Sequence, residues 1–275
     1  MKTIVAAVDF SKDSFNAANY AADMASITGY NLLIVHVCPY PIAIDEVGLA
    51  YYSMGETITS AETEMEKLKT KLTARTKGIL KVSAIVKEGD IVGGIKECCA
   101  SANTFAVVMG RSELNALERT LIGSRTITAV RRLSWPVITV PPNIQFEHIR
   151  NIGIACDFRD VMDTLPTKEI TDIVKATKAN LHVLHIDPLS GDRDDTKTMQ
   201  ESGVLRQLLA SLKPHYYFIK GENTDDEIID FAEKYQLDLL IIIPKTHGLF
   251  DKIFRHSHSR QLVLHAHVPV MSVHG

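Results

Sequence analysis

Residues 3–10 read TIVAAVDF, and residues 151–158 return to the same pattern as NIGIACDF. In both stretches a short apolar run leads into an aspartate followed by a phenylalanine. Continuous apolar runs of this length are typical of strands that are buried on both faces of a parallel sheet. The stretch therefore predicts the first strand of an α/β fold, and its return indicates that the fold occurs twice.

Two further stretches repeat in the same order along the chain. The run NLLIVHV at 31–37 returns as NLHVLHI at 180–186, and WPVITV at 135–140 returns as VPVMSV at 268–273. The first pair of repeats is offset by 148 residues (151 − 3). Solenoid repeats have periods of roughly 20–50 residues, so an offset of this size indicates a duplicated domain.

Each copy alternates short runs rich in Val, Ile and Leu with longer helical patterns, which predicts a doubly wound, mostly parallel sheet flanked by helices. The strands are expected near residues 3–8, 31–37, 79–86, 104–109 and 136–140 in the first copy, and near 151–156, 181–186, 215–220, 238–243 and 269–273 in the second. We therefore predict two tandem five-stranded α/β domains, at residues 1–142 and 149–275.

Helix signals fit between these strands. Ser11 is a plausible N-cap and Gly29 a natural stop for the first helix. Its buried stripe is expected at Phe15, Ala18 and Ala22. In the next helix Met65, Leu68 and Leu72 fall on one face.

Composition places the chain among ordinary globular proteins. It has 275 residues, 45% of them hydrophobic, and a net charge of -3. No run of basic residues exceeds Arg131-Arg132, so nucleic acid is not expected as a partner. No apolar stretch approaches the ~20 residues that span a bilayer. Asp9 interrupts the first apolar run too early for a signal peptide, and the four cysteines form no spaced framework, so we expect a cytoplasmic protein.

Ligands of doubly wound sheets bind beyond the carboxyl ends of the strands, where the strand order reverses. The residues at these ends are Asp9, Cys38 and Gly110, and Gly123-Ser124 opens the last helix of the first copy. A helix that opens with Gly and Ser offers free N–H groups and a positive dipole end, which suit a phosphate. The alternative is that Gly123 is a turn residue and Ser124 an ordinary N-cap.

The ordered set of motifs resembles the universal stress protein family over essentially the whole chain. Members of that family that bind ATP carry Gly, two residues, Gly, nine residues and then Gly-Ser or Gly-Thr. Here Gly110 is followed by Glu113 at the position of the second glycine, and nine residues later by Gly123-Ser124. The strand that ends in Asp9 and the strands at 31–37 and 135–140 also look like family hallmarks.

The resemblance implies a Rossmann-like fold of the adenine nucleotide alpha hydrolase type and a site for ATP or a related adenine nucleotide, with Mg²⁺ as a possible companion. Asp9 and the backbone of Val37 would hold the adenosine end, and Met109 and Gly110 would approach the ribose and phosphates. The full implied set is Ala7, Asp9, Val37, Met109, Gly110, Gly123, Ser124, Arg125 and Thr126. Glu113 would oppose a phosphate by Coulomb repulsion, which Arg111 and Arg125 could offset.

The second copy departs further from the family pattern. Asp157 and Ile186 remain, but Pro244 stands at the Gly110 position and His256-Ser257 replace Gly123-Ser124. Proline supplies no N–H group. We therefore expect the nucleotide site in the first domain alone.

These features lead to one leading hypothesis and two alternatives. The leading hypothesis is a stress-response protein that binds the nucleotide without rapid turnover and has no catalytic residues. One alternative is a slow ATP hydrolase that uses Asp9 or Glu113 to position a metal or a water, and the other is an interaction scaffold without nucleotide. The C-terminal His-x-His pairs predict no metal site, since residues i and i+2 of a helix point apart.

Each copy ends in an apolar strand after a proline, at 137–140 and 270–273, and these strands are expected at a sheet edge. Exposed apolar edges invite strand pairing. The sequence therefore predicts that the two domains pair within one chain, as family dimers do, with a further homodimer left open.

Overall fold

The computed structural model describes residues 1–40, 49–111, 123–156, 161–188, 195–221, 223–244 and 258–274. The chain divides into two compact units, Met1–Phe146 and Glu147–Gly275. We call them domain 1 and domain 2, and each is described by itself.

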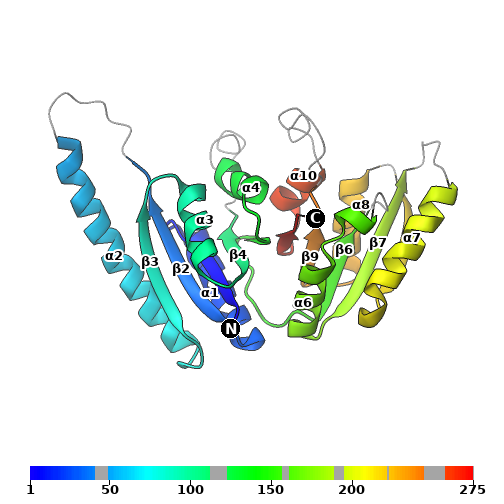
Figure 1. Ribbon diagram of the computed structural model, residues 1–275, viewed down its shortest axis with the longest axis horizontal. Coiled ribbons are helices and arrows are strands. Elements are labelled where there is room, and N and C mark those ends of the chain that lie inside the picture. The colour runs from blue at the N-terminus through cyan, green and yellow to red at the C-terminus, as the bar shows by residue number, and fades with distance from the viewer. Residues whose placement is uncertain are drawn as a thin grey trace. The chain divides into compact units, whose positions relative to one another are not determined.

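Domain 1 alternates strands and helices, as the sequence predicts (Figure 1). Its strands pair in the order β3-β2-β1-β4-β5, and all of these pairs are parallel. The elements are β1 (Thr3–Ala7), α1 (Lys12–Thr28), β2 (Asn31–Cys38), α2 (Leu49–Arg75), β3 (Val82–Glu88), α3 (Ile91–Ser101), β4 (Thr104–Gly110), α4 (Gly123–Arg132) and β5 (Val137–Val140).

The core of domain 1 lies on both faces of this sheet. On one face, Ile95 of α3 and Leu133, which follows α4, pack with alternate strand residues such as Val35 and Val107. Helices α1 and α2 contact the strands as a second pair, α1 against β1 and β4 and α2 against β2 and β3. The central strands are therefore covered by apolar side chains throughout, which explains their continuous hydrophobic pattern.

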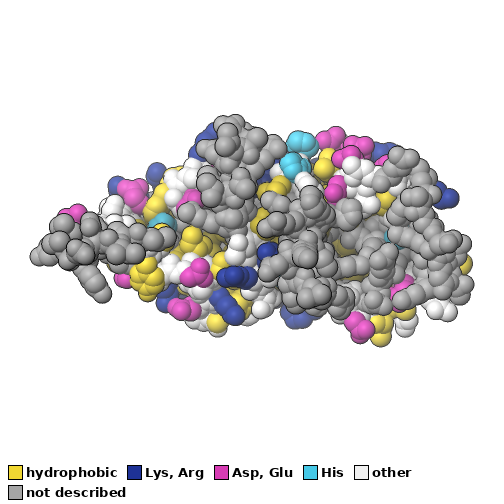
Figure 2. Space-filling model, turned by 90° about the horizontal axis from the view of Figure 1, so that it is seen from above, with side chains coloured by type: hydrophobic (Ala, Val, Ile, Leu, Met, Phe, Trp, Pro, Cys, Tyr) yellow, Lys and Arg dark blue, Asp and Glu magenta, His cyan; other side chains and the backbone are white. Residues whose placement is uncertain are grey.

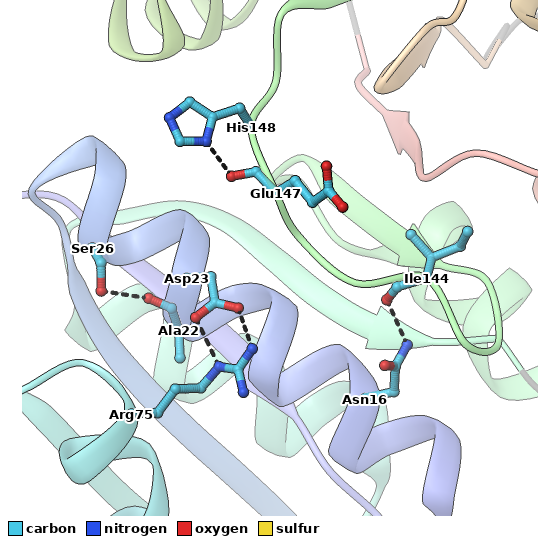
Figure 3. Close-up of polar contacts among 8 residues, drawn as sticks. All are labelled: Asn16, Ala22, Asp23, Ser26, Arg75, Ile144, Glu147 and His148. Atoms are coloured by element: carbon cyan, nitrogen blue, oxygen red, sulfur yellow. Dashed lines mark hydrogen bonds and ion pairs between the residues drawn. The ribbon is translucent and has the colours of Figure 1, made fainter.

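Helix α1 starts and stops where its sequence signals predict. The Ser11 hydroxyl accepts a hydrogen bond from the Ser14 N–H group, and Gly29 ends the helix in the left-handed conformation with φ 69°. Asp23 of α1 receives two hydrogen bonds of 2.7 Å from Arg75 of α2 (Figure 3). This two-point contact joins the two helices on their exposed side.

The segment that follows β5 runs along α1 and belongs to domain 1. The Asn16 side-chain amide donates to the carbonyl oxygen of Pro141 at 3.3 Å. It also donates to that of Ile144 at 2.9 Å (Figure 3). Farther along the helix, the rings of Tyr20 and Phe146 meet edge to face at 5.0 Å between centroids. Residues 141–146 are therefore a packed strap on α1.

Domain 2 repeats the plan, with strand order β8-β7-β6-β9-β10 and parallel pairs. Helix α8 contacts β7, β8 and α10, whereas α5 and α6 contact α7. The elements are β6 (Asn151–Ala155), α5 (Val161–Thr164), α6 (Thr167–Thr177), β7 (Asn180–Pro188), α7 (Asp195–Leu209), the 3-10 helix η2 (Ala210–Leu212), β8 (His215–Gly221), α8 (Thr224–Lys234), β9 (Leu239–Ile242), α10 (His258–His265) and β10 (Val270–Ser272).

The predicted fold class is confirmed, and two local expectations are wrong. Strand β3 begins at Val82 and not near residue 79, because Lys77 and Gly78 both take positive φ after α2 and leave Ile79 exposed. Phe15 is only partly buried, since it lies near the start of the helix with its ring 6.3 Å from that of Phe10, whereas Ala18 and Ala22 are buried as expected.

Candidate functional site

The carboxyl ends of β1, β2 and β4 lie side by side in domain 1. Ala7 is in register with Val35 of β2 on one side and with Met109 of β4 on the other. Val37 lies two residues beyond Val35, the last residue of β2 that pairs with β1. The strand order reverses between β1 and β4, which is where doubly wound folds bind ligands. The fold therefore brings Ala7, Val37 and Met109 to one edge.

Two of these side chains are committed to the protein core. Val37 and Met109 belong to the cluster that packs under α3 and α4, and a Cβ on Gly94 of α3 would come within 2.9 Å of the Val37 side chain. Their side chains therefore fix the strand ends in place. At these positions it is the backbone at the edge that a ligand could approach.

Asp9 lies just beyond β1 and is exposed. Its Oδ1 atom accepts hydrogen bonds from the Ser11 N–H group at 3.1 Å and the Ser11 hydroxyl at 2.6 Å. Its own N–H group donates to the Ser14 hydroxyl oxygen at 3.2 Å. These bonds hold the carboxylate at the start of α1 with a defined orientation.

Gly110 at the end of β4 has a structural requirement of its own. A Cβ at this position would lie 2.5 Å from the carbonyl oxygen of Asp13 in α1. Real Cβ atoms do not approach backbone so closely, so the glycine is needed for β4 to pack against α1. The sequence assigned Gly110 to the approach of a ligand, and the structure adds that α1 already requires it.

Helix α4 begins at Gly123, close to the end of β4. The Thr126 hydroxyl donates to the Gly110 carbonyl oxygen at 3.4 Å, and Thr126 is buried. This contact ties the first turn of α4 to the strand end. The first four N–H groups of a helix have no partner within the helix, and they point out from its positive end. Glu113 lies outside the described residues.

His36 is a residue of this edge to which the sequence gave no role. Its Nδ1 atom donates to the Val8 carbonyl oxygen at 2.8 Å, and its ring lies 4.3 Å from the ring of Phe10. Phe10 takes φ 64°, a conformation that a bulky residue adopts only when its surroundings hold it there. The recurrence of a histidine near the end of the second strand in both copies was the signal that could have found this contact.

Domain 2 keeps this histidine contact but differs from domain 1 at the end of β9, the strand that corresponds to β4. His185 Nδ1 donates to the Cys156 carbonyl oxygen at 3.0 Å, as His36 does to Val8. Pro244 follows β9 and is buried, so the position that matches Gly110 offers no N–H group. Asp157, His256 and Ser257 lie outside the described residues.

Other chemistry at these edges is limited within the described part of the chain. No group of three or more His, Cys, Asp or Glu side chains there could hold a metal ion. Burial raises the pKa of the Cys99 thiol to about 12 and raises that of Cys98, so both stay protonated. Among the helices described, none is long and apolar enough to cross a membrane. Figure 2 shows Lys and Arg side chains interspersed with Asp and Glu where the surface is described.

The fold and its strand-end edge define a tandem protein of the doubly wound α/β class. A model of the universal stress protein family matches residues 1–141 and again residues 148–274, and the chain belongs to that family. No match was found among the curated proteins.

Two solved structures match the chain over its whole length and share the tandem fold. A universal stress protein from Archaeoglobus fulgidus DSM 4304 is 17% identical with a TM-score of 0.74, over 99% of this chain and 96% of that one. A putative universal stress protein from Pseudomonas aeruginosa UCBPP-PA14 is 13% identical with a TM-score of 0.63, over 99% and 93%. A third match, a universal stress protein from Archaeoglobus fulgidus in complex with dAMP, covers 45% of this chain and 97% of that one, at 17% identity and a TM-score of 0.36.

Proposed function

We propose that domain 1 binds ATP or a related adenine nucleotide at the carboxyl edge of its sheet, as part of a cytoplasmic stress response, without rapid turnover. One observation carries the proposal. Because Ala7 of β1 is in register with Met109 of β4, Asp9 and Gly110 follow or end adjacent strands at the same edge, and the Thr126 hydroxyl ties the first turn of α4 to Gly110. Domain 2 has Pro244 where this arrangement needs Gly110.

Each part of the edge suits one part of a nucleotide. Asp9 presents an oriented carboxylate, which accepts hydrogen bonds from hydroxyl groups such as those of a ribose. The backbone at Ala7, Val37 and Met109 lines the strand ends. The N–H groups of Gly123, Ser124, Arg125 and Thr126 would bind the phosphates, with the helix dipole in support. Mg²⁺ would arrive bound to those phosphates, since Mg²⁺ in nucleotide sites keeps phosphate and water ligands.

Binding without rapid turnover fits the state of the carboxylate. Oδ1 of Asp9 already accepts two hydrogen bonds from Ser11, one of them at 2.6 Å. These two bonds fix the orientation of the carboxylate, and we propose that it accepts a hydrogen bond from a ribose hydroxyl and does not act as a base. The site therefore suits a protein that reports the presence of a nucleotide.

Mass spectrometry of the small molecules released from freshly purified protein tests this function. The proposal expects an adenine nucleotide in a molar ratio near one per chain. Steady accumulation of the diphosphate from added ATP would favour the slow hydrolase. Absence of any bound nucleotide, together with no binding of added ATP, would favour the scaffold and contradict the proposal.

Pairing of the two domains within one chain is part of the same proposal and rests on the duplication of the domain and the short connection between the copies. The substitutions I138K and M271K place a charge in the last strand of each domain. Both variants are expected to show a larger radius in small-angle X-ray scattering. An unchanged radius in both would contradict the pairing.

A further inference from the structure

Domain 2 buries a histidine inside a cluster of aromatic rings. His182 of β7 is 8% exposed, and its Nδ1 atom lies 3.1 Å from the hydroxyl of Tyr217 in β8. Tyr235, just beyond α8, lies 5.9 Å from the His182 ring and 4.6 Å from that of Tyr217. Phe231 of α8 completes the set at 4.3 Å from Tyr235. We call His182, Tyr217, Phe231 and Tyr235 the His182 cluster.

The second nitrogen of His182 has no hydrogen-bond partner among the described residues. Its Nε2 atom is buried from solvent. The Tyr217 hydroxyl can donate to Nδ1 or accept from it, so the neutral ring keeps one bond in either tautomer. The protonated ring would carry an N–H donor at Nε2 as well, buried with its charge and without an acceptor, and that costs free energy.

Among the described residues, the groups around His182 add no compensating negative charge. From β8 it faces His215, its register partner, at 5.5 Å between ring centroids, and Tyr217. On the α8 side it faces Tyr235, whose ring carries the Lys234 ammonium at 5.5 Å. On β6 its partner is Gly153, which has no side chain.

Burial in this cluster, and secondly the neighbouring His215, lower the pKa of His182 from its ordinary value of 6.5. The Tyr217 phenol stays protonated, because burial raises its pKa. The unfolded or open chain therefore binds a proton that the closed chain does not. Stability of the closed state is complete above pH 6.5 and falls as the pH drops toward the lower folded value.

We propose that the His182 cluster makes the corner formed by β7, β8 and α8 an acid-sensitive part of domain 2, which opens reversibly below about pH 6.5. Opening uncovers the ring of Phe231, which is 2% exposed, and exposes more of the rings of Tyr217 and Tyr235, which are partly buried at neutral pH. Domain 1 has Leu33 at the position that matches His182, and Leu33 packs in the apolar core. The sheet of domain 1 therefore has no buried histidine at this position.

Hydrogen–deuterium exchange of the full chain at pH 7.0, 6.0 and 5.0, corrected for intrinsic exchange rates, tests the proposal by peptide. In the wild type the opening constant of peptides from 215–235 is expected to rise by up to about tenfold per pH unit below 6.5. In H182L, which restores the residue of the first copy, this rise should vanish. The control H267Q, at an exposed histidine, should behave as the wild type does.

An equal rise in H182L, or a flat profile in the wild type, would overturn the proposal. If H182L does not fold, the ring resonances of His182 in the wild-type spectrum supply the second measurement. Titration of those resonances with a midpoint at or above pH 6.5 would contradict the proposal equally, and a midpoint well below it would support it.

Discussion

The imidazole Nδ1 atom of His36 donates a hydrogen bond of 2.8 Å to the carbonyl oxygen of Val8, and thereby joins the end of β2 to the residue that follows β1. Domain 2 repeats the contact between His185 and Cys156 at 3.0 Å. Because the contact is present in both copies, although only one keeps Gly110 at the edge, we assign it to the architecture of the strand ends. A carbonyl oxygen only accepts, so Nδ1 carries the proton and the neutral ring has its lone pair on Nε2.

The substitution H36A should lower the free energy of unfolding of domain 1 by about 1–2 kcal/mol, because it leaves the Val8 carbonyl without this donor and removes the ring from Phe10. Fluorescence of Trp135, the single tryptophan, follows the unfolding of domain 1 in urea. H36N keeps a side-chain donor and should recover part of the loss. Equal stability of H36A and the wild type would contradict the structural role of His36.

A substitution at Gly110 tests whether this glycine is needed for packing, independently of ligand binding. G110A should destabilise domain 1 by about 1–3 kcal/mol in the absence of any nucleotide, because the new Cβ would meet the Asp13 carbonyl oxygen and α1 would have to shift. G55A is the matched control, since a Cβ there meets nothing within 4 Å and alanine favours the helix by up to about 1 kcal/mol. Urea unfolding of both variants is the measurement. An unchanged free energy of unfolding in G110A would contradict the packing role, because it would show that α1 can shift without loss of stability.

The regular parts of the fold could be predicted from the sequence because local signals agree with the tertiary structure. The strands at 31–38 and 104–110 coincide with continuous apolar runs. Ser11 and Gly29 could be recognised as the two caps of α1 because serine and glycine are preferred at these positions. The start of β3 could not be predicted, because the apolar Ile79 looks like strand although the turn at Lys77 and Gly78 places it outside the sheet.

The site was harder to predict, since it depends on contacts between distant segments. The bond from His36 to Val8 needs the register of two parallel strands, and the requirement for glycine at 110 needs the position of α1 over β4. The strap from Pro141 to Phe146 likewise depends on the face of α1 that presents Asn16. The spacing of a sequence motif can identify the residues at the carboxyl edge of the sheet, but it does not predict the packing contacts that position them.

Glu113 occupies the second glycine position of the family motif. E113G should tighten ATP binding about fivefold, because removal of one negative charge near the phosphates is worth about 1 kcal/mol when solvent screens it. E113Q removes the charge and keeps the side chain, so an equal gain would assign the effect to charge, and a gain in E113G alone would assign it to the glycine backbone. Titration calorimetry at low and high salt measures both, and unchanged or weaker affinity in both variants would contradict the prediction.

We expect one adenine nucleotide to bind per chain, at the edge of domain 1 that Asp9, Gly110 and α4 form. Titration calorimetry of the nucleotide-free full chain with Mg-ATP tests it most directly, in the wild type, in G123L at the first residue of α4, and in S257A in the second copy. Trp135 fluorescence should first show that G123L is folded. A stoichiometry near one is expected for the wild type and S257A, and no binding for G123L. A stoichiometry near two, equal effects of the two substitutions, or no heat of binding in the wild type would contradict it.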